Sequence, residues 1–506
     1  MEEPFHIPVG SEKTPGKFFS REWLADSLHP VKSDGLLMYL VMLCASLFFA
    51  YLITRFGFIP GVLILAVLIG LPVVYGLIVY PRFGVLVFLS SAYFIMFIDR
   101  MGVDFPLGTL MDFMELLFII GFFIHQRTEK NWKIFKGPLS IMILIWILYN
   151  VLEVLNPSAE SRLAWLYTVR SVAFIMLMFF VFLYNIRTRE FIRIVLKLWL
   201  LFSLIGALYG LKQEFFGFNG PEEAYLHSDP NIEQLLFIGG TWRKFSIFTD
   251  PVSFSYNMVI SALLCIGLIT GPLKTWKKVV LGGIAAICLY SMLYSGTRGA
   301  FVLPPFALAV MAILRFNKRV FLVGAIAAVF LAILVFMPTS SQSVQRFQSA
   351  FRPSEDASFN VRKYNQKRIQ PYILSHPIGG GLGATGAWGQ RFAPYSFLAS
   401  FPPDSGYVRV AVELGWVGLL IFCTLMFMIL RTGILHFYAI RDPELKSYCL
   451  AMVLIVFALN LGNYPQEALV QFPTNVYFYL VTALIVITKR IDDEDRQLTE
   501  PVKQVL

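Results

Sequence analysis

Hydrophobic runs of roughly 20 residues recur along the whole chain, and polar segments separate them. An α-helix of about 20 apolar residues is long enough to cross the hydrocarbon core of a bilayer. We therefore predict an all-α fold, a polytopic transmembrane helix bundle. The pattern predicts fourteen spans, at approximately residues 36–55, 57–80, 84–98, 107–125, 139–156, 164–185, 191–216, 251–271, 278–294, 300–315, 319–337, 406–430, 446–463 and 470–488. The third and tenth runs are short, so we expect twelve to fourteen spans.

One polar segment, residues 338–405, is much longer than the others. Its apolar positions predict amphipathic helices at Ser341–Phe351 and Asn360–Leu374, and the glycine-rich run 378–383 ends the second helix. The segment is basic, with Arg346, Arg352, Arg362, Lys363, Lys367, Arg368 and Arg391 against Glu355, Asp356 and Asp404. The expected division of the chain is an N-terminal segment 1–35, helices in 36–337, the long loop 338–405, helices in 406–488 and a tail 489–506.

The distribution of lysine and arginine predicts the orientation of the bundle. One or both of these residues are frequent in alternate short loops, at 125–138, 187–197, 274–278, 315–319 and 431–446. Because cytoplasmic loops carry the excess of positive charge, we expect both termini in the cytoplasm and the long loop on the outer face. Long loops cross the membrane largely regardless of their charge, so the basic loop is compatible with this orientation. Its charge indicates either an anion site facing the outer leaflet or a solvated helix pair.

Composition narrows the classes of function. The chain is 57% hydrophobic and only 15% charged, and its formal charge of +10 mostly reflects the cytoplasmic loops. The sequence contains no phosphate-binding P-loop and no Cys, His and carboxylate spacing typical of a metal site. We therefore expect no cofactor, no metal and no nucleic-acid partner.

Arginines at the outer ends of the predicted helices are candidates for chemistry. Arg298 lies in a glycine-flanked turn between two spans. Its guanidinium suits phosphate oxygens, and snorkelling to lipid headgroups is the alternative interpretation. Arg243 precedes Asp250 and Pro251, and this aspartate is more typical of a helix cap than of a catalytic group.

Four segments, taken in order, resemble the motifs of one family. They are Arg243 to Pro251, Gly296 to Gly299, Arg362 with the later run Pro377 to Gly383, and Asp404 to Tyr407 with Glu413 to Gly418. The family is the O-antigen ligase and polymerase superfamily, which consists of bacterial integral membrane glycosyltransferases of the C type. The resemblance covers approximately residues 200–430, and Leu208 to Glu214 adds a similarity to polymerases of exported polysaccharides. The chain departs from the family pattern where Ser246, Val252, Gln366 and Asp404 replace glycine, asparagine, tryptophan and the histidine of the ligase branch.

The resemblance implies a glycosyl transfer at the outer, periplasmic face of the bacterial inner membrane. A glycan held on undecaprenyl diphosphate would pass to an acceptor sugar hydroxyl, without a metal. Cationic groups at the leaving diphosphate would stabilise its growing negative charge. By this resemblance Arg243 and Arg298 hold the diphosphate and Arg362 adds to it from the loop. Asp404 acts as the general base or, alternatively, caps the helix that follows it.

Further side chains are expected to contact the substrate: Arg170, Arg368, Tyr407 and Gln213. Arg170 lies inside the sixth predicted span, and an ion pair with Glu153 or Glu214 is its structural alternative. Both interpretations of Arg170 stay open from the sequence.

The loss of the ligase histidine favours a polysaccharide polymerase. The alternative of the same class is an O-antigen ligase or a protein O-glycosyltransferase, and the alternative of another class is a lipid or polysaccharide transporter or flippase. The sequence shows no inverted repeat of the kind that transporters carry. The expected partners are the undecaprenyl-diphosphate-linked glycan, the acceptor glycan, the lipid bilayer, and chain-length regulator and export proteins.

Overall fold

The computed structural model describes residues 73–101, 107–130, 132–238, 240–316, 335–340, 342–351 and 357–499, with isolated residues within 43–70 and 322–333. The chain divides into two units, Met1–Tyr80 and Pro81–Leu506. The described part of the first unit includes a helix at residues 73–79. The spans predicted at 36–55, 57–80 and 319–337 lie largely outside the described residues. All elements named below belong to the second unit.

The second unit is built almost entirely from helices, which confirms the predicted all-α class. Its described helices are α4 (Pro81–Arg100), α5 (Leu107–Glu129), η1 (Trp132–Phe135), α6 (Pro138–Leu152), η2 (Glu153–Leu155), α7 (Arg162–Val169), η3 (Arg170–Phe174), α8 (Ile175–Asn185), α9 (Arg189–Phe215), α10 (Gly220–Leu226), α11 (Pro230–Leu236), α12 (Pro251–Ile269), α13 (Thr275–Leu293), α14 (Arg298–Phe301), α15 (Leu303–Leu314), α17 (Gln342–Ser349), α18 (Ala357–Ser375), α19 (Gly386–Phe392), α20 (Gly406–Glu413), α21 (Gly415–Ala439), α22 (Pro443–Gly462) and α23 (Thr474–Thr499). The short strands β1 (Phe237–Ile238) and β2 (Thr241–Trp242) form an antiparallel pair.

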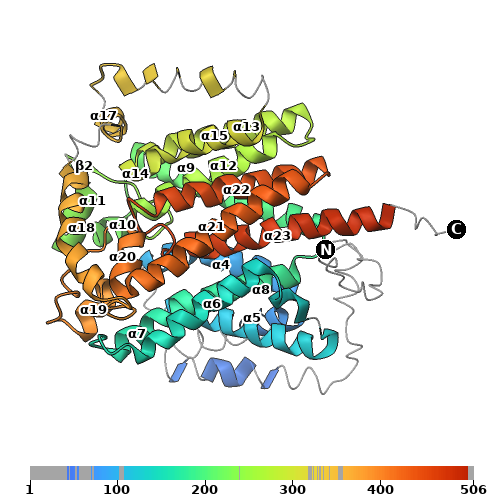
Figure 1. Cartoon of the computed structure of the whole chain (residues 1–506), viewed down its shortest axis with the longest axis horizontal. Helices are drawn as coiled ribbons and strands as arrows, with labels where there is room; N and C mark the ends of the chain where they lie inside the picture. The colour runs from blue at the N-terminus through green and yellow to red at the C-terminus, as the bar shows by residue number, and fades with distance from the viewer. Residues whose placement is uncertain are drawn as a thin grey trace. The chain divides into compact units, whose positions relative to one another are not determined.

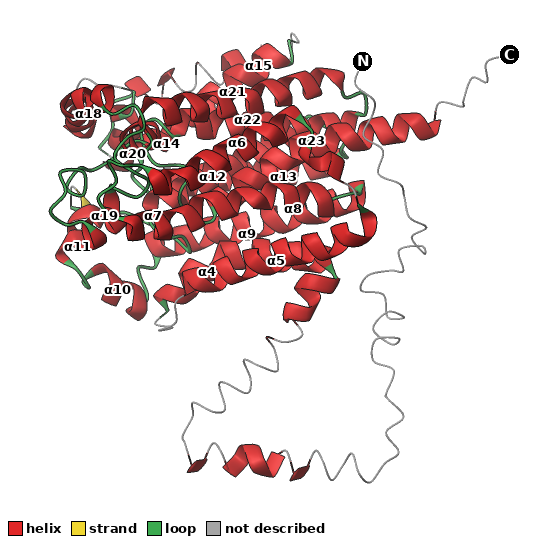
Figure 2. Ribbon diagram, turned by 60° about the horizontal axis from the view of Figure 1, so that its bottom comes forward, coloured by secondary structure: helices red, strands yellow, loops and turns green. Residues whose placement is uncertain are grey.

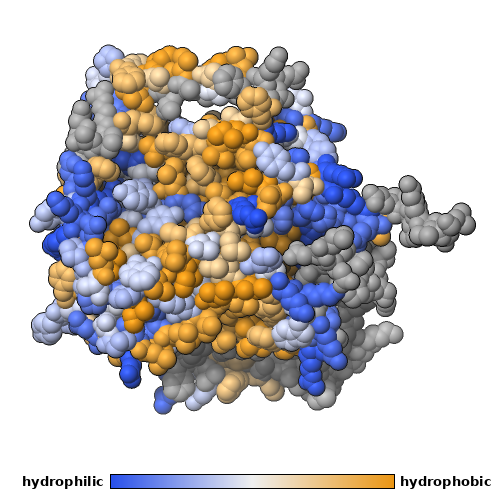
Figure 3. Space-filling view, viewed as in Figure 1, coloured by the Kyte–Doolittle hydropathy of each residue, from blue (hydrophilic) through white to orange (hydrophobic). Residues whose placement is uncertain are grey.

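Ten helices among the described residues are long and apolar enough to cross a membrane. They occupy residues 81–100, 108–127, 138–155, 162–185, 189–215, 251–269, 275–293, 415–439, 443–462 and 474–498. The long helices run side by side, and a band of hydrophobic residues covers the face shown, between hydrophilic residues at its two ends (Figures 1 and 3). The second unit therefore has the architecture of a multi-pass membrane bundle.

Helices α12, α22 and α23 form the centre of this bundle. The buried share of their most apolar windows is 83%, 78% and 89%, against 28% for α13 and 33% for α21. Small residues let helix backbones approach closely inside a membrane. At Gly267 of α12, a Cβ atom would lie 2.4 Å from that of Ala451 on α22, so this crossing requires glycine.

Three predicted spans differ in length from the helices. The run at 84–98 is part of a longer helix of 20 residues, α4. This helix begins at Pro81, because proline is well tolerated at the first position of a helix. The run at 300–315 forms α14 and α15, which separate at Val302 just before two prolines. The run at 406–430 forms the separate helices α20 and α21, since Gly415 between them has φ +67°.

The shorter helices gather at one end of the bundle. Helices α10, α11, α18, α19 and α20 lie together at the end opposite the C-terminal part of α23 (Figures 1 and 2). Helices α17 and α18 correspond closely to the amphipathic helices predicted for the long loop. This end carries most of the candidate residues.

Candidate functional site

Arg243 joins two of the predicted motif segments. Its Nε donates a hydrogen bond to the carbonyl oxygen of Ser295 at 2.8 Å, and its Nη2 donates to Thr297 Oγ1 at 3.0 Å. The Thr297 hydroxyl in turn donates to the carbonyl oxygen of Pro251 at 3.1 Å. Arg243 therefore holds the turn from which Arg298 projects.

Asp250 has the capping role that the sequence favours. Its carboxylate accepts hydrogen bonds from the backbone N–H groups of Val252 and Ser253 at 2.7 and 2.9 Å, at the start of α12. Burial raises the pKa of Asp250, and these two hydrogen bonds oppose that shift. The contacts explain the Asp-Pro pair as a helix start.

A cavity of about 480 Å³, which we call the cationic cavity, brings Arg298 and Arg362 together. Lys363 also lines it, from the same helix as Arg362. Its other lining residues are Gly299, Val302, Leu303, Ala350, Phe359, Gln366, Leu461, Tyr464 and Pro465. None of these described lining residues is acidic, and many are apolar. The cavity thus combines positive charge with a hydrophobic wall.

Arg362 lines this cavity with one nitrogen, Nε, that has no hydrogen-bond partner among the described residues. This nitrogen is buried. Buried charged donors usually have partners, because an unsatisfied one costs free energy. An anionic ligand in the cationic cavity would supply the missing acceptor.

The glycine-rich run of the long loop packs against the break between α20 and α21. The N–H groups of Gly380 and Gly381 donate to the carbonyl oxygens of Val412 and Glu413, each at 2.9 Å. At Gly379, with φ +74°, a Cβ atom would lie 2.4 Å from the backbone nitrogen of Gly415. The glycines therefore permit backbone-to-backbone packing between two motif segments.

Glu413 fixes the same contact from its side chain. It is 2% exposed and accepts hydrogen bonds from the N–H of Gly383 at 3.0 Å and from both the N–H and the hydroxyl of Thr385. Arg409 Nε donates to it at 3.2 Å, and Arg409 Nη1 donates to Glu467 at 2.7 Å. Burial raises the pKa of Glu467, although Arg409 opposes the shift. This group of three charged side chains, in which Glu413 is buried and Arg409 and Glu467 are partly buried, ties the loop, α20 and the α22–α23 connection together.

Asp404 does not cap the helix that follows it. Ser405 is the N-cap of α20, and its hydroxyl accepts from the N–H of Val408 at 3.5 Å. Asp404 is partly exposed, and its negative charge acts on Glu467. The neighbouring Gly406 N–H donates to the carbonyl oxygens of Asn463 and Gln466, in the connection that also lines the cationic cavity. The cap alternative is therefore wrong, and the role of Asp404 as base stays a prediction.

Arg170 forms an ion pair that the sequence did not identify. Its Nη1 lies 2.6 Å from Asp112 of α5, so neither expected partner is correct. Glu153 is engaged by Asn156 at 2.8 Å, and Lys244 lies 3.3 Å from Glu214. These pairings depend on which helices are neighbours, which spacing along the chain does not reveal.

The other expected substrate contacts lie in different surroundings. Gln213 is fully buried and bonds Glu222 and the backbone of Ser246, a residue with φ +55°. The Tyr407 hydroxyl donates to Asn460, and Arg368 is exposed with its guanidinium over the ring of Phe397. None of these three side chains lines the cationic cavity. Their contact with substrate remains a prediction.

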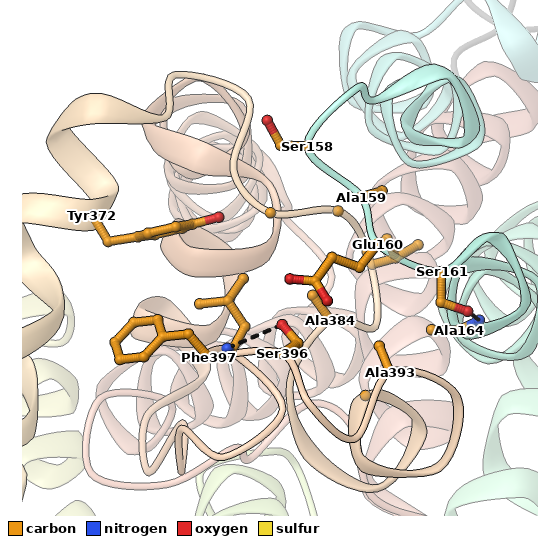
Figure 4. A pocket seen from close by; sticks show the side chains of 15 residues that line it. Ser158, Ala159, Glu160, Ser161, Ala164, Tyr372, Ala384, Ala393, Ser396 and Phe397 are labelled. Atoms are coloured by element: carbon orange, nitrogen blue, oxygen red, sulfur yellow. Dashed lines mark hydrogen bonds between the residues drawn. The ribbon is translucent and has the colours of Figure 1, made fainter.

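A smaller cavity of about 60 Å³ is lined in part by the glycine-rich run, and Figure 4 shows it from close by. Glu160, from the segment before α7, points into it toward Tyr372 and Phe397 of the long loop (Figure 4). A water occupies about 30 Å³ in the liquid, so this cavity has room for water molecules but not for a sugar ring. Its lining comes from the segment before α7, from the start of α7 and from the long loop.

The sequence did not identify Lys363, Arg409 or Glu467 as site residues, although Lys363 was counted in the basic loop. Lys363 is adjacent to Arg362, and its place in the basic loop was the available signal. Arg409 and Glu413 stand four residues apart, a helical spacing that indicates a pair. Glu467 lies in a short connection and gave no signal, because its contact with Arg409 spans 58 positions.

Comparison with known proteins supports the resemblance. A search of curated proteins gives no match. Residues 283–423 match the family model described as O-antigen ligase, and this range contains Arg298, Arg362, the glycine-rich run and Asp404. The match supports the resemblance of this part of the chain to the O-antigen ligase and polymerase superfamily.

Proposed function

We propose that this protein is a polysaccharide polymerase that joins glycan repeat units carried on undecaprenyl diphosphate. The reaction takes place at the outer face of the inner membrane, with both termini in the cytoplasm. The cationic cavity holds the lipid diphosphate of the donor. The observation that carries this proposal is the convergence of Arg298, Arg362 and Lys363 on one cavity from α14 and α18.

The lining of the cationic cavity matches both parts of such a donor. The three cations of the lining suit the several negative charges of a diphosphate. The Nε–H group of Arg362 is buried and has no hydrogen-bond partner among the described residues. Val302, Leu303 and Leu461 provide apolar contacts for a prenyl chain. Arginine suits phosphate oxygens because its planar fork can donate two parallel hydrogen bonds.

The proposed chemistry is a substitution at the anomeric carbon of the donor. The oxygen of an acceptor hydroxyl forms a new bond to that carbon, and the bond from the carbon to the diphosphate oxygen breaks. The diphosphate leaves with the bonding electrons, so the cations that face it are more strongly attracted in the transition state than in the ground state. Asp404 accepts the hydroxyl proton. Its segment is hydrogen-bonded to the connection Asn463–Gln466, whose Tyr464 and Pro465 line the cavity.

Arg243 has a supporting place in this scheme. It holds Ser295 and Thr297, and so it orients the turn that precedes Arg298. Its charge also adds to the positive potential near the diphosphate.

The test is the substitution Arg298→Ala, with polymer length and yield measured in cells. Loss of one charge-assisted hydrogen bond of about 1.5–3 kcal/mol should reduce transfer by about 10- to 100-fold. Lys367→Ala is the matched control, since Lys367 lies on α18 but does not line the cavity. Normal polymer from Arg298→Ala, at normal protein levels, would refute the diphosphate site. Transfer of finished glycan to lipid A core or to protein by the purified enzyme, without chain growth, would indicate a ligase.

A further inference from the structure

A second cavity, which we call the α6–α20 cavity, lies on the other side of the α22–α23 connection. Its volume is about 370 Å³, within the range of about 300–1,000 Å³ that is usual for small-molecule sites. The connection separates the two cavities: Tyr464 and Pro465 line the cationic cavity, whereas Asn463 and Glu467 line the α6–α20 cavity. A molecule in the second cavity is therefore close to one in the first.

Four side chains that line the α6–α20 cavity carry buried polar atoms without a hydrogen-bond partner among the described residues. These atoms are Trp146 Nε1, Asn150 Oδ1, Thr168 Oγ1 and Asn463 Oδ1. The four residues are at most 3% exposed. Unsatisfied polar groups are rare in protein interiors because burying them is costly. Their concentration in one cavity indicates a ligand with several hydroxyl groups, each able to donate and accept.

The charge of this cavity excludes the ligand proposed for the other one. Its charged lining residues are Arg409, Glu413 and Glu467, and Arg409 is bonded to both carboxylates. A cation already paired with two carboxylates leaves no positive charge for a phosphate. The cavity therefore favours a ligand that is uncharged or cationic.

Aromatic side chains complete the lining. Trp146, Trp388 and Phe422 contribute aromatic rings to the wall, together with aliphatic side chains, so the cavity has apolar surface as well as the polar atoms described above. A sugar ring has the corresponding surface, with C–H groups on its faces and hydroxyl groups around its edge.

We propose that the α6–α20 cavity binds a sugar ring of the acceptor glycan, whose hydroxyl attacks the donor held in the cationic cavity. The identity of this ligand as an acceptor rests on the proposed function. The sugar hydroxyls satisfy Asn150, Thr168 and Asn463, and the ring packs against the aromatic wall. Glu467, in the connection between the cavities, lines the acceptor side.

The test measures binding of an oligosaccharide without donor. The probe is the repeat-unit oligosaccharide released from the polymer of the host, titrated into the purified full-length protein in lipid nanodiscs. Thr168→Val and Asn150→Leu should each weaken binding by about tenfold or more, as expected for the loss of a hydrogen bond to ligand. Thr482→Val is the matched control, because Thr482 is buried in α23 and its hydroxyl bonds Phe478 of the same helix.

Thr168→Val decides the result if Asn150→Leu does not fold, since the Thr168 hydroxyl has no partner to lose among the described residues. Wild-type affinity in Thr168→Val, or no binding by the wild-type protein, would overturn the sugar site. Neither result would affect the diphosphate site, which Arg298→Ala tests separately. Conversely, weakened oligosaccharide binding in Thr168→Val together with normal polymer from Arg298→Ala would support the sugar site and refute the proposed donor site.

Discussion

Replacing Arg362 by methionine tests whether this arginine binds a ligand or stabilises the fold. Methionine has a similar length and an apolar side chain, and Phe359 and Leu461 are apolar neighbours in the same cavity. No described residue accepts a hydrogen bond from the buried Arg362 Nε. The substitution therefore removes a charge without breaking a described internal contact at this atom.

Arg362→Met should preserve or raise the stability of the unliganded protein but lower the rate of glycosyl transfer. A buried donor without a partner costs about 1–3 kcal/mol, so Arg362→Met should leave the unliganded protein as stable as the wild type or more stable. In the donor complex, the same substitution removes a charge-assisted hydrogen bond of about 1.5–3 kcal/mol. Transfer should then fall by about 10- to 100-fold.

The assay combines thermal unfolding of the purified protein with transfer from a lipid-linked donor. Arg409→Met is the control for stability, because Arg409 bonds both Glu413 and Glu467. Breaking such a buried group should destabilise the protein by about 3–5 kcal/mol, since two carboxylates remain without their cation. Arg362→Met should show the reverse pattern, an unchanged or higher unfolding temperature with slow transfer.

Two results would refute this reasoning. Transfer by Arg362→Met within about twofold of the wild type would mean that no strong hydrogen bond to the donor was lost. An unfolding temperature lowered as far as that of Arg409→Met would show that Arg362 is structural.

Further predictions concern Asp404 and Glu467. Asp404→Asn should lower turnover by about 10²- to 10⁴-fold and leave donor affinity almost unchanged, and an equal loss of donor binding and turnover would contradict the role of Asp404 as base. Ser405→Ala should instead lower the stability of the protein by about 1 kcal/mol, because the cap of α20 is lost. Burial raises the pKa of Glu467, so its stabilising contribution is complete below the ordinary glutamate pKa of about 4.3 and is lost as the pH rises through the raised value. Glu467→Gln should therefore weaken the fall in thermal stability that accompanies a rise in pH above the ordinary glutamate pKa, and an unchanged pH dependence would show that another group causes it.

The sequence predicted the membrane-spanning helices well because each span must be apolar by itself, independently of its neighbours. A span must bury about 20 apolar residues in lipid whichever helices surround it, so hydropathy along the chain is sufficient to find it. The ten spans of the described residues all correspond to predicted runs. The helices of the long loop were predicted for a similar reason, since one face of each is apolar.

The break between α20 and α21 could not be predicted in the same way. Val408, Val410, Ala411 and Val412 continue the apolar character of α21, so the region reads as one span. The helix is interrupted because Gly415 takes a positive φ and the glycine-rich run packs against it. That contact joins segments more than 30 positions apart and has no counterpart in local composition.

The sequence by itself determined the class of the protein, an all-α membrane bundle, and showed arginines in segments that resemble the motifs of the O-antigen ligase and polymerase superfamily. Tertiary structure decided the roles of individual side chains. It placed Arg298 and Arg362 on one cavity, used Arg243 to hold the turn beside them, and paired Arg170 with Asp112. It also gathered Trp146, Asn150, Thr168 and Asn463 around a second cavity. Hydropathy reflects the interaction of a helix with lipid and is local, whereas an ion pair or a cavity depends on which helices pack together.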